Sequence, residues 1–398
     1  MTLKKHQDIL PPGFRASGIS SGIKKSGRKD LSLFISDTPC ITAAMMTAND
    51  FKAAPLFVSA RHLSQGGIRA LIANSGNANC MTGQKGLSDA FAMAGLAAAS
   101  VGLKTEEVLV ASTGIIGKPL PLAKIRAAMP DLVRGLSGRG LKDASAAIMT
   151  TDTFSKEVVW RGRLAGKAVT ISGTAKGAGM IAPRMKMGTM LAFCFTDARI
   201  EKAALREALF QAVEASFNSI TIDGCMSTND MALVMANGHA AGAVIKRGSR
   251  QAREFARRLE EVCLALAKMI VEDAEGATKF IEVRVKGARH REQARQYAFS
   301  VANSNLFKCA MFGSDPNWGR IASAIGSVAG GLGVRDLSIA LNGVTVLKSG
   351  EPLAVRQKGL LKGRQVVVDI RLGRGAGESV VYTSDLSYDY VRINADYS

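Results

Sequence analysis

The sequence predicts an α/β protein, because segments of strand character alternate with amphipathic helices along the chain. The predicted strands are short apolar runs bounded by turn residues, at 16–19, 22–25, 30–36, 53–58, 70–73, 107–111 and 190–195. The predicted helices repeat apolar side chains at helical spacing, at 86–103, 201–217 and 249–271. A hairpin is expected over 158–169, and 398 residues suffice for one large domain or two to three ordinary ones.

The composition indicates an aliphatic core and gives no sign of a membrane segment. Hydrophobic residues make up 47% of the chain, and no run of 18 apolar residues occurs. Residues 1–14 lack the apolar stretch of a signal peptide. Six cysteines are scattered without a CxxC spacing, which favours reduced thiols over disulfides or a zinc site. We therefore expect a cytoplasmic protein.

The formal net charge of +19 is compatible with nucleic-acid binding, since Lys and Arg neutralise phosphates. The basic residues are nevertheless spread over the chain, and no helix-turn-helix, zinc finger or aromatic-basic RNA signature accompanies them. We favour a solvated basic surface that steers acidic substrates, with no specific nucleic acid and no membrane as partners.

The most informative stretch runs from Lys176 to Ala198. Glycines follow Lys176, Pro183 ends the turn, and the pair Gly188-Thr189 stands just before an apolar run of strand length. One interpretation is a glycine-rich loop that leads into a core strand. The other is cleavage before Thr189, whose hydroxyl then becomes a nucleophile with its own α-amine as the base. The stretch by itself leaves both open.

Seven motifs in this sequence resemble the glutamate N-acetyltransferases of arginine biosynthesis, also called ornithine acetyltransferases. The central stretch is similar to the family's Lys-Gly-x-Gly-Met-Ile-x-Pro-x-Met-Ala-Thr-Met-Leu, which is cleaved before the threonine. The other motifs follow in family order and extend the resemblance over nearly the whole chain, at 74–83, 113–117, 150–153, 227–230, 313–320 and 388–398.

The sequence departs from the family pattern at two places. Five residues, 184–188, separate Pro183 from Thr189 where three are usual, and Gly188 replaces the usual alanine. Cys225 and Met226 replace the usual Asp-Thr ahead of the motif at 227–230.

The resemblance implies an α/β fold of mixed sheets sandwiched by helices, of the ornithine acetyltransferase or DmpA-like type. It also implies self-cleavage into an α chain, residues 1–188, and a β chain, residues 189–398, with Thr189 at its N-terminus. The α chain carries the oxyanion-hole part, and two copies of each chain are expected to form an α2β2 heterotetramer.

The activity that the resemblance implies is acetyl transfer from N-acetylornithine to glutamate by a ping-pong route. The sequence leaves open whether acetyl-CoA is a further donor, which would make the enzyme bifunctional. No metal or organic cofactor is needed. The implied roles are a nucleophile, Thr189, with cleavage between Gly188 and Thr189; an oxyanion hole, Thr113 and Gly114; and substrate binding by Thr153, Lys176, Thr189, Glu275, Asn394 and Ser398.

Two other classes of protein compete with this interpretation. One is an N-terminal-nucleophile aminopeptidase or amidase on the same scaffold, in which water replaces the amino acid as acyl acceptor. The other is a binding protein that has lost processing, which the longer joint at 184–188 would allow.

Overall fold

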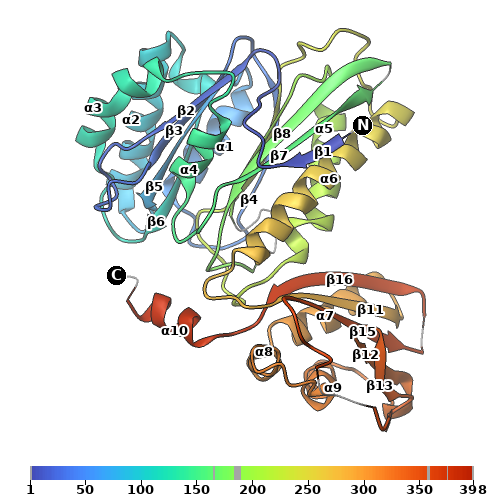
Figure 1. Cartoon of the computed structure of the whole chain (residues 1–398). Coiled ribbons are helices and arrows are strands. Elements are labelled where there is room, and N and C mark those ends of the chain that lie inside the picture. The colour runs from blue at the N-terminus through green and yellow to red at the C-terminus, as the bar shows by residue number, and fades with distance from the viewer. Residues whose placement is uncertain (1, 165, 183–189, 356–358, 374, 397–398) are drawn as a thin grey trace. The chain divides into compact units, whose positions relative to one another are not determined.

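The computed structural model describes residues 2–164, 166–182, 190–355, 359–373 and 375–396 (Figure 1). The chain forms two compact units. The first comprises Met1–Gly177, Pro183–Asn218 and Met226–Ile270, and the second Ala178–Ala182, Ser219–Cys225 and Val271–Ser398. These units are defined by how the chain packs. The predicted boundary between residues 188 and 189 is a site of cleavage, and it stays a prediction.

The first unit contains a mixed sheet of six described strands in the order β1-β7-β8-β9-β10-β4. Strands β9 and β10 are parallel, and the other neighbours are antiparallel. The strands are β1 (Thr2–Lys5), β4 (Ile41–Met46), β7 (Lys156–Leu164), β8 (Lys167–Lys176), β9 (Leu191–Thr196) and β10 (Met231–Ala236).

A second sheet of the same unit has the order β2-β3-β5-β6, with β5 and β6 parallel. Its strands are β2 (Phe14–Ile19), β3 (Leu31–Ser36), β5 (Ala70–Asn77) and β6 (Val108–Ile115). The two sheets pack face to face, because Phe34 of β3 lies against Phe193 and Phe195 of β9, with ring centroids 5.8 and 4.9 Å apart. A shared aliphatic and aromatic core fills the space between them.

Helices cover the outer faces of this pair of sheets (Figure 1). Apolar residues of α2 and α3 share a core with β3, β5 and β6, while α5 and α6 lie outside the six-stranded sheet. Strands β3, β9 and β10 are therefore buried along their whole length. The helices of this unit are α1 (Ala54–Gln65), α2 (Gly83–Val101), α3 (Leu122–Arg134), α4 (Leu141–Ile148), α5 (Lys202–Ala215) and α6 (Arg250–Glu272), which runs into the second unit.

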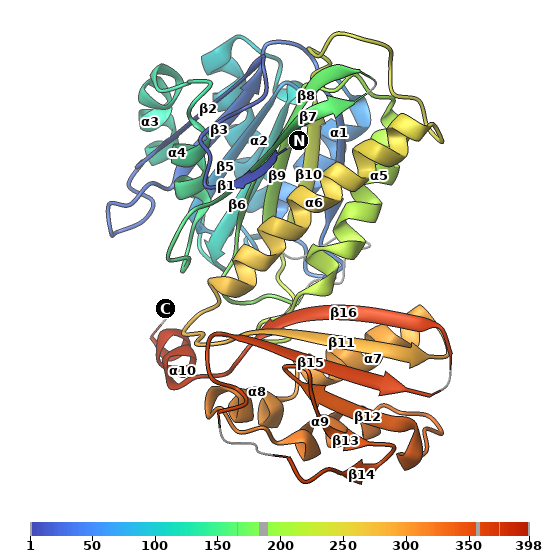
Figure 2. The same ribbon diagram turned by 45° about the vertical axis from the view of Figure 1, so that its right-hand side comes forward.

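The second unit has a mixed sheet in the order β14-β13-β12-β15-β11-β16, covered by helices (Figure 2). Its strands are β11 (Phe280–Ala288), β12 (Leu337–Leu341), β13 (Val344–Lys348), β14 (Glu351–Pro352), β15 (Gln365–Leu372) and β16 (Gly377–Ser384). Its helices are α7 (Arg291–Ala302), α8 (Asn305–Phe312), α9 (Trp318–Gly326) and α10 (Tyr388–Ala395). Short 3-10 turns occupy Thr105–Glu107, Phe217–Ser219 and Val334–Asp336.

The predicted α/β fold of mixed sheets sandwiched by helices is confirmed. Two local predictions were wrong. Residues 53–58 begin α1 rather than forming a strand, because Pro55 suits the first turn of a helix and buried side chains recur on one helical face. Residues 22–25 lie in a turn organised by Asp30. No helix in the described part of the chain is long and apolar enough to cross a membrane.

Candidate active site

Lys176 and Thr113, two residues predicted for the site, meet at the ends of two strands from different sheets. Lys176 is the last residue of β8 and Thr113 lies near the end of β6. Their exposed fractions are 8% and 9%, and Lys176 Nζ donates a hydrogen bond of 3.2 Å to Thr113 Oγ1. Because the ammonium occupies a lone pair of the hydroxyl oxygen, the hydroxyl can direct its own proton to another acceptor. The pair therefore offers a donor polarised by a positive charge.

Gly114 follows Thr113 at a point where only glycine fits. Its φ is +131°, and an added Cβ would lie 2.5 Å from the carbonyl carbon of Gly76 and 2.6 Å from the nitrogen of Asn77. Gly76 is also its register partner on β5. The predicted pair Thr113-Gly114 thus sits in a tight junction between the carboxyl ends of β5 and β6.

Asn229 braces this junction and was not singled out from the sequence. Its Nδ2 donates to the carbonyl oxygens of Ala78, at 2.6 Å, and Ser112, at 2.9 Å. Ser112 Oγ in turn donates to Asn74 Oδ1 at 2.6 Å. The motifs at 74–83 and 227–230 therefore fold against the strand end that carries Thr113, which gives them a common structural role.

A buried ion pair fixes the chain directly after Lys176. Asp152 Oδ1 accepts hydrogen bonds of 2.7 Å from both Lys156 Nζ and the Gly177 amide, and the side chains of Asp152 and Lys156 are 0% exposed. Burial raises the pKa of Asp152, but the positive charges of Lys156 and Lys176 and these hydrogen bonds outweigh it and hold the pKa well below its usual range. The predicted Thr153 lies next to Asp152 in an exposed turn.

The chain leaves the six-stranded sheet at Lys176 and re-enters it opposite the same residue, because Lys176 pairs with Leu191 of β9. Met190, just before β9, is buried and has a φ of +140°, a conformation that L side chains rarely adopt. The predicted cleavage pair, Gly188 and Thr189, lies outside the described residues. In the sequence, Thr189 precedes Leu191 by two positions.

The second unit holds two further predicted residues, and the structure brings them together. Asn394 of α10 donates through Nδ2 to Glu275 Oε2 at 2.7 Å. The Glu275 amide donates to the carbonyl of Ala178, and its carboxylate lies so close to Gly179 that an added Cβ would be 2.4–2.5 Å from it. The second glycine of the Lys-Gly-x-Gly motif therefore makes room for the carboxylate. Ser398 lies outside the described residues.

Asp223, which the sequence showed only as part of a variant motif, organises the same region of the second unit. Its carboxylate accepts from the amides of Met180, at 2.6 Å, and Ile181, at 3.0 Å, and from the Tyr390 hydroxyl, at 3.2 Å. Burial raises the pKa of Tyr390, and the neighbouring Asp223 raises it further, so the phenol stays a donor. Sequence analysis assigned no role to Asp223, because its contacts come from residues far away in the sequence.

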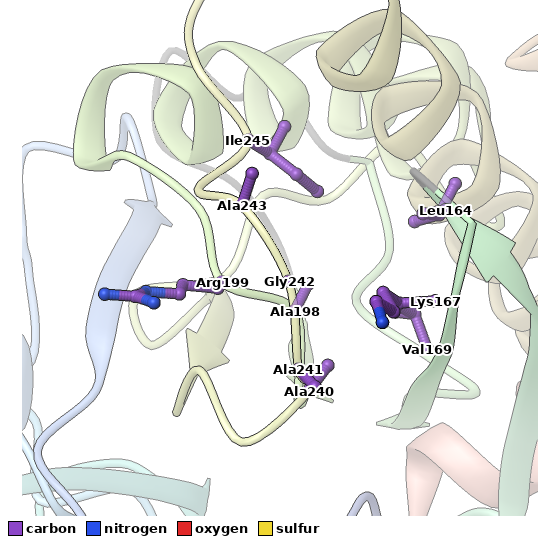
Figure 3. A pocket seen from close by; sticks show the side chains of 10 residues that line it. All are labelled: Leu164, Lys167, Val169, Ala198, Arg199, Ala240, Ala241, Gly242, Ala243 and Ile245. Atoms are coloured by element: carbon purple, nitrogen blue, oxygen red, sulfur yellow. The ribbon is translucent and has the colours of Figure 1, made fainter.

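A pocket in the first unit lies at the opposite end of β8 from Lys176 (Figure 3). None of the predicted site residues lines it, and its charged members are Lys167 and Arg199. Its lining consists of Leu164, Lys167, Val169, Ala198, Arg199, Ala240, Ala241, Gly242, Ala243 and Ile245. Among the residues that the structure describes, no cluster of His, Cys, Asp and Glu is arranged to hold a metal ion.

A family model described as the ArgJ family matches residues 15–398. The chain belongs to the ArgJ family. It is 48% identical to the arginine biosynthesis bifunctional protein ArgJ of Geobacter sulfurreducens, over 97% of this chain and 98% of that one. It is 45% identical to the protein of that name from Symbiobacterium thermophilum, over 97% of each chain. A crystal structure of the Bacillus halodurans protein of that name is 38% identical, with a TM-score of 0.49, and the match covers 50% of this chain and 96% of that one.

This membership confirms the predicted family and, with it, the predicted class of enzyme. The protein is therefore an acyltransferase of arginine biosynthesis.

Proposed function

We propose that the protein cuts itself before Thr189 and then transfers acetyl groups from N-acetylornithine to glutamate through an acetyl-threonine intermediate. The observation that carries this proposal is the hydrogen bond from Lys176 to Thr113. It supplies a charged, polarised donor at the strand ends, and β9 leads back to the same place through the pairing of Lys176 with Leu191. Two residues of extended chain span at most about 7 Å, which supports Thr189 as the nucleophile.

Self-cleavage begins when the Thr189 hydroxyl attacks the carbonyl carbon of Gly188. The peptide C–N bond then breaks, which frees the α-amine of Thr189, and water hydrolyses the resulting ester. Backbone strain supports this site of cleavage, because Met190 with its φ of +140° holds strain of about 1–3 kcal/mol next to the scissile bond.

In the first half of transfer, the Thr189 hydroxyl attacks the acetyl carbon of N-acetylornithine and gives its proton to the α-amine. An α-amine with an ordinary pKa of about 7.7–8.0 can take this proton at neutral pH. The C–N bond breaks and the ornithine nitrogen receives the proton. Thr113 and Gly114 stabilise the tetrahedral oxyanion, and losing one such donor costs about 100- to 1000-fold in rate.

In the second half of transfer, the amine of glutamate attacks the acetyl ester, which restores the hydroxyl and releases N-acetylglutamate.

The substrate-binding roles follow from charge. Lys176 suits the α-carboxylate, which is two bonds from the reacting nitrogen, and Thr153 contributes a hydroxyl in the turn next to Asp152. Glu275, held by Asn394, suits an amino group of the substrate. Ser398 is the candidate for one further contact at the C-terminus.

The same proposal includes an α2β2 assembly, a cytoplasmic location and acetyl-CoA as a second acetyl donor for glutamate. The mass of the native assembly tests the α2β2 state. Incubation of the protein with glutamate and acetyl-CoA, in the absence of N-acetylornithine, tests acetyl-CoA as a donor.

Intact-mass analysis and N-terminal sequencing of the purified protein test the cleavage. We expect two fragments, the second beginning at Thr189. Incubation with N-acetylornithine, with and without glutamate, then tests the transfer. Release of acetate without N-acetylglutamate would identify the aminopeptidase or amidase alternative, and one uncleaved, inactive chain would identify the binding protein.

A further inference from the structure

The turn between β2 and β3 is built around the buried carboxylate of Asp30. Asp30 Oδ1 accepts from the amide and the hydroxyl of Ser21, at 2.6 and 2.7 Å, and Oδ2 accepts from the Lys24 amide at 2.9 Å. The carbonyl of Asp30 accepts from the amide of Ser75 on β5 at 2.9 Å. The backbone of Lys24 is therefore fixed relative to the carboxyl end of β5.

The side chain of Lys24 lies against the same glycine that pairs with the predicted oxyanion hole. A Cβ on Gly76 would be 3.0 Å from Lys24 Cγ, and Gly76 is the register partner of Gly114. Lys24 is half-buried, and its Nζ donates to the carbonyl of Lys29 at 2.7 Å. An ammonium has three donors, so this bond leaves capacity for a ligand.

Charges of both signs act on Lys24. The carboxylates of Asp30 and Asp152 favour its charged form, whereas the positive groups of Lys176 and Arg28 oppose it. Burial lowers the pKa of Lys24 to about 8, although both carboxylates raise it, and Lys176 lowers it further. A partly desolvated ammonium beside a second cation is a suitable partner for an anionic ligand.

We propose that Lys24 binds the side-chain carboxylate of the glutamate acceptor. This assignment rests on the proposed function. Lys176 touches Thr113, so it suits the α-carboxylate near the reacting nitrogen, whereas Lys24 lies beyond Gly76 and suits the more distant carboxylate. N-acetylornithine carries an ammonium in place of that carboxylate, so Lys24 serves the second half of the reaction and not the first.

Lys24→Met tests the assignment, with Lys25→Met as the matched control because Lys25 is its exposed neighbour. The first half-reaction is followed as ornithine released from N-acetylornithine alone, and the second as N-acetylglutamate formed. We expect Lys24→Met to raise the KM for glutamate about 10- to 100-fold and to leave ornithine release within about twofold of wild type. Lys24→Arg, which keeps the charge, should restore most of the affinity, and Lys25→Met should change neither half.

Glutamine as acceptor separates recognition from a structural effect. Wild type should prefer glutamate to glutamine, and Lys24→Met should lose most of that preference. An unchanged preference, or equal damage to both half-reactions, would overturn the assignment. If wild-type protein released no ornithine at all, the proposed function itself would be wrong, whatever the variants did.

Discussion

The ammonium of Lys176 donates a hydrogen bond to the hydroxyl of Thr113 across 3.2 Å, and this bond joins the end of the six-stranded sheet to the end of the four-stranded sheet. A cation that contacts a hydroxyl at a buried strand end makes that hydroxyl a stronger hydrogen-bond donor to a developing negative charge. In the proposed mechanism, this bond therefore makes the stability of the transition state depend on how the two sheets pack.

Replacing Thr113 by valine should separate transition-state stabilisation from binding. The side chain keeps its shape but loses the hydroxyl, so kcat should fall about 100- to 1000-fold with little change in the KM for N-acetylornithine. Thr113→Ser should retain most of the activity. A raised KM with normal kcat would make Thr113 a binding residue instead.

Thr189→Ala should abolish both processing and transfer, because both steps use the same hydroxyl. A denaturing gel should show one band near the full 42.0 kDa, and no ornithine should be released from N-acetylornithine. Thr189→Ser provides the control that keeps a hydroxyl. Turnover near the wild-type rate in the alanine variant would refute the nucleophile.

Gly179→Ala should move Glu275 without unfolding the protein. The added Cβ would be 2.4–2.5 Å from the carboxylate, which is the mobile end of its side chain, so the carboxylate shifts and the backbone does not. We expect the KM for N-acetylornithine to rise about 10-fold while the melting temperature changes little. Gly95→Ala, whose Cβ would meet nothing closer than 3.8 Å, is the control and should leave the KM unchanged.

Asp152→Asn should destabilise the fold by about 3–5 kcal/mol at neutral pH, because it leaves the buried ammonium of Lys156 without its charge partner. The pKa of Asp152 is depressed in the folded state, so its contribution is complete above about pH 4 and is lost as the pH falls below that value. The variant should therefore lose less stability on acidification than wild type in denaturant titrations.

Asp131→Asn is the control for that measurement, since the ion pair of Asp131 with Arg134 is exposed and contributes less than about 1 kcal/mol. If both variants lost the same free energy of unfolding, the buried ion pair would stabilise the fold no more than the exposed pair does.

Deleting Lys186 and Met187 should leave processing intact, because it restores the usual three residues between Pro183 and the threonine. The glycine at 188 can take backbone angles that alanine cannot, which suits the longer natural joint. N-terminal sequencing of the second fragment should give the same threonine in the deletion variant and in wild type. A second fragment that begins at Met190 would show that Thr189 is not the nucleophile.

Long periodic segments and most short apolar runs were predictable from the sequence, whereas the runs at 22–25 and 53–58 were not. The helices α2, α5 and α6 follow from apolar side chains that recur every three to four residues. Residues 53–58 contain too few positions to separate a strand from the first turns of a helix. The turn at 22–25 depends on Asp30, whose hydrogen bonds no local pattern reveals.

The candidate site divides in the same way. Thr113 and Lys176 stand in motifs and Glu275 matches a family position, so a resemblance could select all three. The contact between Thr113 and Lys176 joins residues 63 positions apart, and only the packing of two sheets creates it. Lys24, Asp223 and the partnership of Asp152 with Lys156 depend on burial and on neighbours distant in sequence, which single-sequence patterns do not encode.

The strand order β1-β7-β8-β9-β10-β4 has a consequence for the proposed cleavage. A cut before Thr189 leaves β9 and β10, from the second fragment, inserted between β8 and β4, from the first. Neither fragment alone contains all the strands of this sheet, and each would expose unpaired strand edges. Folding must therefore precede the cut. After denaturation, recovery of the cut protein would require two separate chains to meet, so its yield would depend on concentration, whereas the uncut precursor refolds as a single chain.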